Sequence, residues 1–269
     1  MTPRRTWTIA LVVLALPLTA WGQPMLPEGT KAERNLEYVK DGHERNKLDL
    51  YRPMKADGPT PVLVWIHGGA WKAGSKDRCP LLLMTAKGYA VASINYRFLA
   101  HGDFPAQIED CKAAIRWLRA NAKTYNLDGS RIGVMGASAG GHLASLLGVA
   151  GDAKDLEGKG GNLDQPSNVQ AVVSLFGPLR IPARNAAKSS VLSYITKDDP
   201  PFLLVHGDAD KTVPISQSER LTEALKKAGV EVTFVPIEGA GHGGLAFANA
   251  EMQAKYLEFF DKHLKKPKK

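Results

Sequence analysis

The sequence predicts an α/β fold in which helices cover both faces of a mainly parallel sheet. Short apolar runs alternate along the chain with segments of helical periodicity, which is the order that such a sheet requires. Several of these runs are apolar at every position, as expected for strands buried on both faces. The chain has 269 residues, 44% of them hydrophobic and 23% charged, and no linker rich in Pro, Gly or Ser divides it. One large domain accounts for this length.

Residues 1–22 have the pattern of a secretory signal peptide. Arg4 and Arg5 precede an apolar run over residues 7–19, and small residues follow at the expected cleavage site. The run is too short for a comfortable membrane span, although an uncleaved anchor is the alternative. We therefore expect a single domain over residues 23–269, in a secreted or periplasmic protein with no stable membrane insertion after the leader is removed.

The net charge of +8 does not by itself predict a nucleic-acid partner. The leader contains two arginines and no acidic residue, so its removal lowers the net charge to +6. Lys265, Lys266, Lys268 and Lys269 supply four of the remaining charges and form a basic C-terminal tail. Because the rest of the chain is nearly balanced, we expect no nucleic-acid-binding face.

Cys79 and Cys111 are the two cysteines of the chain. An exported protein permits a disulfide between them. Two buried free thiols are the alternative, because the spacing does not place their Cα atoms within bonding range. The sequence agrees with both states.

The first half of the chain predicts a sheet edge, two buried strands and two helices. We expect an antiparallel hairpin at this edge, because two segments in which apolar and polar residues alternate flank Asp41-Gly42. In the longer helix, Lys112, Arg116 and Arg119 lie largely on the side opposite to the apolar residues. Strands are expected over residues 36–40, 47–51, 62–66 and 90–95, and helices over residues 80–87 and 105–120.

The second half continues the alternation of strands and helices. Residues 151–168 are polar and rich in glycine, which indicates a loop, and their acidic residues match no calcium-loop spacing. In a parallel sheet the ligand site lies beyond the carboxyl ends of the strands. Strands are expected over residues 132–135, 169–176, 202–206 and 232–236, and helices after Ser138 and over residues 216–228 and 247–264.

Ser138 is the candidate nucleophile. It is the centre of Gly-Ala-Ser-Ala-Gly, residues 136–140, between a predicted strand and a predicted helix. A serine on such a sharp turn needs neighbours with almost no side chain, and the helix N-terminus behind it favours developing negative charge. The pentapeptide alone is equally compatible with a catalytic turn and with a turn that only packs small residues. The residues at the other strand ends distinguish these alternatives.

A serine hydroxyl is a poor nucleophile until an imidazole takes its proton, and the imidazole needs a carboxylate to orient it. His242 lies in a glycine-rich loop, and Asp208 and Asp210 follow the strand predicted over residues 202–206. The chain order Ser, Asp, His is that of α/β-hydrolases. His67 is expected to orient its loop by hydrogen bonds, and His206 to be structural.

A second small-residue turn, Gly68-Gly69-Ala70, follows the strand predicted over residues 62–66. Acyl transfer needs backbone N–H groups that bind the developing oxyanion, and only small residues let the backbone approach the substrate carbonyl. The N–H of Ala139, directly after the nucleophile, supplies another donor. The joint occurrence of two such turns, an aspartate and a histidine favours nucleophilic catalysis over packing.

The chain resembles the α/β-hydrolase-fold esterases that carry an HGG(G/A)W turn, close to the hormone-sensitive-lipase-like group, and most closely the bifunctional feruloyl and acetylxylan esterase family. The resemblance implies an eight-stranded, mainly parallel sheet and a reaction without cofactor or metal. It implies Ser138 as nucleophile, His242 as base, Asp210 rather than Asp208 as acid, and Gly69, Ala70 and Ala139 as oxyanion donors. It is carried by VWIHGGAW (64–71), GYAVASINYR (88–97), FPAQIEDCKAAIRWLRANA (104–122), RIGVMGASAGGHLA (131–144), PPFLLVHGDADKTVP (200–214) and GAGHG (239–243).

Two short segments distinguish this chain from that group. Residues 179–201 are shorter than the helical insertion common there, and about a dozen residues precede Leu36 after the leader. We therefore expect no sizeable cap and an open, shallow site, which suits an ester on a bulky polymer better than a long acyl chain. Its expected walls are the aromatic residues Trp71, Tyr96, Phe98, Phe176 and Tyr194.

The sequence thus predicts a secreted serine carboxylesterase acting on short-chain or aryl esters, with acetyl or feruloyl groups on plant polysaccharide as the substrates that the resemblance suggests. An arylformamidase-type amidase is the nearest alternative, because such enzymes share a similar HGGxW turn. A non-catalytic binding protein on a hydrolase fold is the alternative from another class. The oligomeric state is not predicted.

Overall fold

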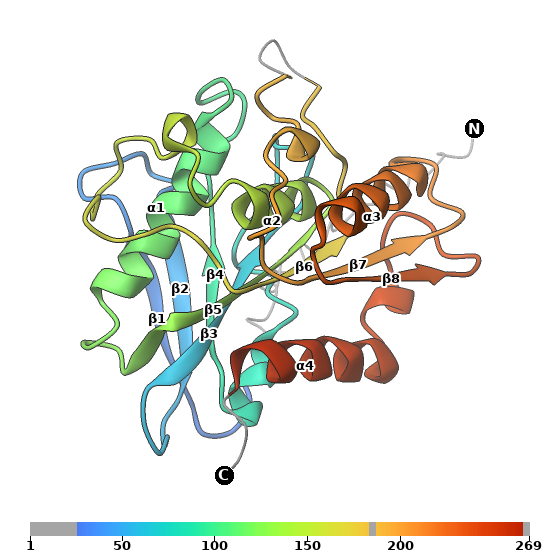
Figure 1. Cartoon of the computed structure of the whole chain (residues 1–269). Coiled ribbons are helices and arrows are strands. Elements are labelled where there is room, and N and C mark those ends of the chain that lie inside the picture. The colour runs from blue at the N-terminus through green and yellow to red at the C-terminus, as the bar shows by residue number, and fades with distance from the viewer. Residues whose placement is uncertain (1–25, 183–186, 266–269) are drawn as a thin grey trace, which may run out of the picture.

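The computed structural model describes residues 26–182 and 187–265, so the predicted signal peptide lies outside the described residues. A sheet of eight strands in the order β1-β2-β4-β3-β5-β6-β7-β8 runs through the molecule (Figure 1). The β1–β2 and β2–β4 pairs are antiparallel and the remaining pairs are parallel, which confirms the predicted sheet. The strands are β1 (Thr30–Glu37), β2 (Lys47–Pro53), β3 (Thr60–Ile66), β4 (Ala90–Ile94), β5 (Leu127–Ala137), β6 (Ala171–Leu175), β7 (Phe202–Gly207) and β8 (Val232–Ile237).

Helices cover both faces of the sheet (Figure 1). One face packs against α1 (Ala106–Ala120), α2 (Ala139–Val149) and α3 (Ser216–Ala228), and the other against α4 (Ala250–Leu264) and the 3₁₀ helix η1 (Leu82–Lys87). Alternate residues of β3 serve the two cores, because successive strand side chains point to opposite faces. No helix within the described ranges is long and apolar enough to cross a bilayer.

The parallel register brings the carboxyl ends of the central strands to one edge. Ile66 at the end of β3 pairs with Gly136, and Ala137 at the end of β5 pairs with Leu175. The turns that follow β3, β5 and β6 therefore leave the sheet side by side. The predicted triad and oxyanion residues lie on the turns after β3, β5, β7 and β8.

Several element boundaries differ from the sequence prediction. Residues 38–46, which include Asp41-Gly42, connect β1 to β2 at the sheet edge, which confirms the predicted antiparallel hairpin, although the first strand ends at Glu37 and not at residue 40. The helix predicted over residues 80–87 is the shorter 3₁₀ helix η1. The helix predicted over residues 247–264 starts only at Ala250, because the Asn249 side chain accepts the N–H of Met252 and caps it. The 3₁₀ helix η4 (Leu245–Phe247) precedes it.

Both cysteines are buried free thiols. Cys111 belongs to the core on the α1, α2 and α3 side, whereas Cys79 belongs to the core on the α4 side. Because the sheet separates the two side chains, the structure selects free thiols over a disulfide.

Lys112 and Arg116, which lie opposite to the apolar residues of α1 in the sequence pattern, are both buried. Lys112 Nζ donates to the carbonyls of Ala150 (2.6 Å) and Gly151 (3.2 Å) and to Glu157 Oε1 (2.6 Å). Arg116 donates to both the carboxylate and the backbone carbonyl of Glu157. The loop over residues 151–168, which contains only the short 3₁₀ helix η2 (Lys154–Leu156), is thereby held over this side of the helix.

Glu157→Gln should lower the free energy of unfolding by about 3 kcal/mol, because it leaves two buried cations without their carboxylate. Urea denaturation measures this difference. Glu223→Gln, on the exposed surface of α3, is the control and should change stability by less than about 0.5 kcal/mol. A loss below about 1 kcal/mol for Glu157→Gln would mean that the loop carbonyls alone stabilise both cations.

Candidate active site

Ser138 occupies a strained turn between β5 and α2. Its backbone angles are φ 54° and ψ −118°, and its N–H donates to the carbonyl of Leu175 (2.9 Å). A Cβ at Gly136 would overlap the backbone of Gly140, and a Cβ at Gly140 would overlap the carbonyl of Ile66. Both positions therefore require glycine, which is the crowding that the pentapeptide predicted.

The structure brings Ser138, His242 and Asp210 into one hydrogen-bonded chain. His242 Nε2 lies 2.8 Å from Ser138 Oγ, and His242 Nδ1 lies 2.6 Å from Asp210 Oδ2. An ionised carboxylate accepts only, so Nδ1 donates to it and Nε2 is free to accept the serine O–H. Asp208 instead accepts the N–H of Gly239 (2.7 Å). The geometry thus agrees with the expected choice of Asp210 over Asp208.

Asp210 is held as a charged, oriented acceptor. Burial acts to raise the pKa of this carboxyl, but hydrogen bonds from His242 and from the N–H groups of Val213 and Thr212 bring the pKa below its usual value. Its Oδ2 also lies 3.3 Å from Nε2 of His206, a buried residue whose Nε2 donates to the carbonyl of Val213. His206 therefore stabilises the loop that presents Asp210, in line with its expected structural role.

Phe176 supports His242 from behind. Its ring meets the imidazole edge-on with centroids 4.7 Å apart and packs in the same manner against Phe247. The residue is buried, and its φ of 39° is unusual for a side chain of this size. Phe176 was predicted to form part of a substrate wall. It instead packs against the imidazole of His242 and limits its movement.

The turn over residues 67–71, which we call the 67–71 turn, presents free backbone donors beside Ser138. Gly69, Ala70 and Trp71 all have positive φ, and the carbonyl of Gly69 accepts the N–H groups of Lys72 and Ala73. Within the described residues, the N–H groups of Gly69, Ala70 and Ala139 donate no hydrogen bond. These are the three donors expected from the sequence.

His67 fixes the base of this turn. It is 4% exposed, and its Nδ1 donates to the carbonyl of Gly68 (2.7 Å), so Nε2 is the acceptor. Arg45 Nη2 lies 3.3 Å from that Nε2 and also donates to the carbonyl of Gly74 (3.1 Å). Burial lowers the pKa of His67 to about 4, which keeps the imidazole neutral and this arrangement intact at neutral pH.

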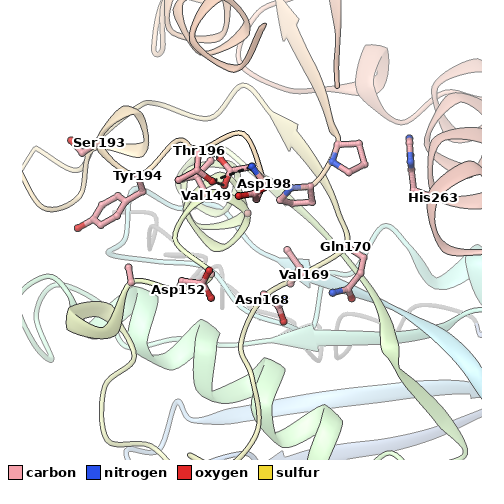
Figure 2. Close-up of a pocket in the computed structure, with 16 residues that line it drawn as sticks. Val149, Asp152, Asn168, Val169, Gln170, Ser193, Tyr194, Thr196, Asp198 and His263 are labelled. Carbon is pink, nitrogen blue, oxygen red and sulfur yellow. Dashed lines mark hydrogen bonds between the residues drawn. The ribbon is translucent and has the colours of Figure 1, made fainter. Parts of the chain in front are cut away.

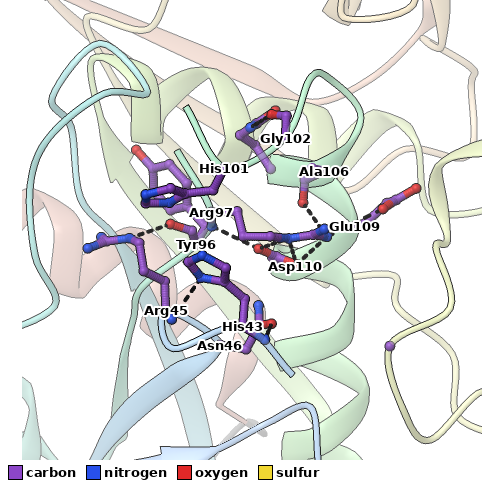
Figure 3. A network of polar contacts seen from close by, with 12 residues as sticks. His43, Arg45, Asn46, Tyr96, Arg97, His101, Gly102, Ala106, Glu109 and Asp110 are labelled. Carbon is purple, nitrogen blue, oxygen red and sulfur yellow. Dashed lines mark hydrogen bonds and ion pairs between the residues drawn. The ribbon is translucent and has the colours of Figure 1, made fainter. Parts of the chain in front are cut away.

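Tyr96 lies beneath the 67–71 turn and not in a substrate wall, which corrects its predicted role. It is fully buried, its ring stacks on His67 with centroids 4.5 Å apart, and its hydroxyl donates to the carbonyl of His67 (3.0 Å). Arg45 reaches the same place from the β1–β2 connection and donates to the carbonyl of Tyr96 (2.8 Å), as Figure 3 shows. No motif marks Arg45 in the sequence, so its role could not be predicted from the sequence.

A pocket of about 560 Å³ opens beside Ser138, and we call it the Ser138 pocket. Trp71 lines it as predicted, whereas Phe98 packs under the guanidinium of Arg45. Tyr194 lines a larger pocket of about 760 Å³ at the amino ends of β6 and β7 (Figure 2), away from the strand ends that hold Ser138. Other residues of the Ser138 pocket include Ala70, Arg180, Ile181, Thr212, Val213 and Gln217.

Two buried neutral histidines should make the fold sensitive to acid. Burial lowers the pKa values of His67 and His142 to about 4, from 6.5 in an unfolded chain. The unfolded state therefore binds more protons as the pH falls, and stability is lost between about pH 6.5 and pH 4, by about 3 kcal/mol for each residue. Urea denaturation across this range measures the loss.

The variant His142→Gln isolates one of these contributions, because glutamine does not titrate and its amide can still donate to the carbonyl of Ser189. Its unfolding free energy should vary less steeply with pH than that of the unmodified protein. Parallel curves for the two proteins would contradict the assignment of His142 as a neutral, buried imidazole.

Comparisons with known proteins agree with this geometry. A family model described as BD-FAE matches residues 48–189, and a model of the prolyl oligopeptidase family matches residues 180–267. Esterase LipC of Mycobacterium tuberculosis is 31% identical over 232 residues, which cover 73% of this chain and 56% of that protein. The chain thus spans little more than half the length of that curated relative.

Two solved structures are also similar. A truncated carbohydrate esterase from gut microbiota is 32% identical, with a TM-score of 0.83 over 90% of this chain and 99% of that one. A bifunctional GH43-CE protein of Bacteroides eggerthii is 36% identical, with a TM-score of 0.81 over 86% of this chain and 35% of that one. The family resemblance and the fold expected from the motifs are confirmed: the chain belongs to the BD-FAE family and has the α/β-hydrolase fold.

Proposed function

We propose that this protein is a serine carboxylesterase in which Ser138, His242 and Asp210 form the catalytic triad. The observation that carries the proposal is the continuous chain of two hydrogen bonds, 2.6 Å and 2.8 Å long, from Asp210 through His242 to Ser138. The relatives named as esterases support the reaction class.

In the acylation step, Ser138 Oγ attacks the ester carbonyl while His242 Nε2 takes its proton. Asp210 stays ionised, holds Nδ1–H toward itself and stabilises the imidazolium that forms. The protonated Nε2 then delivers the proton to the leaving alcohol, and the acyl group remains on Ser138. In the second step His242 activates a water molecule that hydrolyses the acyl-enzyme.

The oxyanion formed in both steps binds to backbone donors. The N–H groups of Gly69, Ala70 and Ala139 carry no other hydrogen bond within the described residues and flank Ser138. Such donors are fixed before the reaction and need no reorganisation when the charge develops, which is why each is worth about 3 to 4 kcal/mol in transition-state stabilisation.

The substrate class is part of the proposal. Within residues 179–201, the described part contains only the short 3₁₀ helix η3 (Val191–Ser193), so little covers the Ser138 pocket from that side. An open pocket favours short-chain or aryl esters, including acetyl or feruloyl groups on a polysaccharide, over long acyl chains. The leader pattern over residues 1–22 is the basis for proposing a secreted or periplasmic enzyme.

Asp210→Asn should reduce kcat for 4-nitrophenyl acetate about 10⁴-fold, because the amide favours the wrong imidazole tautomer. Asp208→Asn is the matched control, since an asparagine oxygen can still accept the N–H of Gly239. Its kcat should stay within a fewfold of the unmodified enzyme. Equal losses in the two variants would remove Asp210 from the triad.

A fluorophosphonate probe separates an enzyme from a binding protein. It should label the purified protein, and the label should disappear in Ser138→Ala. Faster release from N-formylkynurenine than from an aryl acetate would favour the amidase alternative. Persistent labelling of Ser138→Ala would refute the nucleophile, and absence of both labelling and turnover in the unmodified protein would favour a binding role.

Arg45 is a positioning residue in this scheme, because it contacts His67 and not the reacting atoms. Arg45→Met should lower kcat about tenfold or more, with KM little changed, since small displacements of preorganised groups weaken transition-state binding. Arg45→Lys should retain part of the rate, and millimolar guanidinium should restore part of it to Arg45→Met. Arg220→Met, on the exposed surface of α3, is the control.

A purely structural role for Arg45 predicts a different result. Stability would then fall, and neither lysine nor added guanidinium would recover kcat selectively. That outcome would overturn the positioning role while leaving the triad untouched.

A further inference from the structure

The Ser138 pocket contains one charged side chain among its described residues, Arg180. This residue follows β6, is exposed, and has no hydrogen-bond or ion-pair partner in the described part of the chain. Arg45, by contrast, donates to His67, Gly74 and Tyr96. An arginine without a partner in a pocket leaves its five N–H donors available to a bound molecule.

The other polar groups of the pocket add donors. Gln217 uses its Oε1 to accept the N–H of Leu179 (3.2 Å), so its NH₂ group remains free. Thr212 contributes a hydroxyl, while its own N–H is bonded to Asp210. No aspartate or glutamate is found among the described residues that line the pocket. The polar groups of the pocket that remain unpaired are therefore mostly hydrogen-bond donors, and one of them, Arg180, is positively charged.

The remaining side chains that line the pocket are mostly apolar. Trp71, Ile181 and Val213 form buried walls, and prolines at positions 178, 182 and 214 complete them. Such walls suit an aliphatic or aromatic stem that runs from the reacting carbonyl toward Arg180. A ligand that contacts both the apolar walls and Arg180 therefore has an apolar stem that ends in an anionic hydrogen-bond acceptor.

The triad carboxylate does not neutralise Arg180. Asp210 is buried and its oxygens are already bonded to His242, Thr212 and Val213. An incoming carboxylate therefore meets an unpaired guanidinium, which can bind it with two parallel hydrogen bonds.

We propose that Arg180 makes the Ser138 pocket a subsite for anionic esters, in which a carboxylate a few atoms from the scissile bond binds Arg180. The inference rests on the proposed esterase function and specifies its substrate class. The carboxylate belongs to the acyl group or to the alcohol, and the test has one arm for each.

The test uses two pairs of esters that differ in one charge. The acyl arm compares mono-4-nitrophenyl adipate with its methyl ester, and the alcohol arm compares 4-carboxyphenyl acetate with its methyl ester. The charged member of one pair should have a kcat/KM about tenfold higher, mainly through KM. Arg180→Gln should abolish this preference, and Arg180→Lys should keep part of it.

Lys211→Gln is the matched control for a general effect of positive charge. Lys211 is an exposed cation next to Asp210 and Thr212 that does not line the pocket. Its removal should leave the preference unchanged. The inference is overturned if neither charged ester is preferred, if the preference survives Arg180→Gln, or if Lys211→Gln removes it equally.

A binding measurement separates this inference from the proposed reaction. Calorimetry on Ser138→Ala should show tighter binding of the charged member of the preferred pair than of its methyl ester, and Arg180→Gln in that background should remove the difference. If the unmodified protein hydrolyses neither of the two neutral esters, the proposed esterase function is refuted. Equal binding of charged and neutral members would refute the Arg180 subsite even if hydrolysis occurs.

Discussion

The close approach of α2 to the end of β3 is the constraint on which the site depends. Gly140, in the first turn of α2, lies so near the carbonyl of Ile66 that no Cβ fits between them. This contact places the N-terminus of α2, the strained Ser138 and the 67–71 turn at one point of the sheet edge. The backbone itself thus aligns a nucleophile with donors from two separate turns, and the side chains refine the arrangement.

Two histidines near this point, His67 and His242, differ in their surroundings. His67 is buried and hydrogen-bonded through both ring nitrogens. Burial lowers its pKa to about 4, so the ring stays neutral and stabilises the 67–71 turn. His242 instead lies between the Ser138 hydroxyl and the Asp210 carboxylate and is hydrogen-bonded to both. The same residue type thus has a structural role at His67 and the proposed role in proton transfer at His242, and its partners distinguish the two.

The sequence predicted the parts of the site that depend on local backbone chemistry. Ser138, Asp210 and His242 could be found because glycines and strand ends mark them and because parallel strands gather their carboxyl ends. Tyr96 and Arg45 could not be placed correctly. An aromatic residue after a strand can point into a pocket or beneath a turn, and only tertiary packing decides, whereas Arg45 comes from a connection without any motif. The boundaries of η1 and α4 likewise depended on turn chemistry and on the Asn249 cap.

The cations of this protein differ in whether their donors are already occupied by groups of the fold. Lys112 and Arg116 lie opposite to the apolar residues of α1, yet both are buried and bonded to Glu157, because a long loop folds over them. Near the site, Arg45 is similarly fixed by carbonyls and an imidazole. A fixed cation has its donors occupied and cannot discriminate between ligands. Arg180 has no partner among the described residues and lines the pocket beside Ser138, so its charge contributes little to the described fold and can serve the proposed selection of substrate.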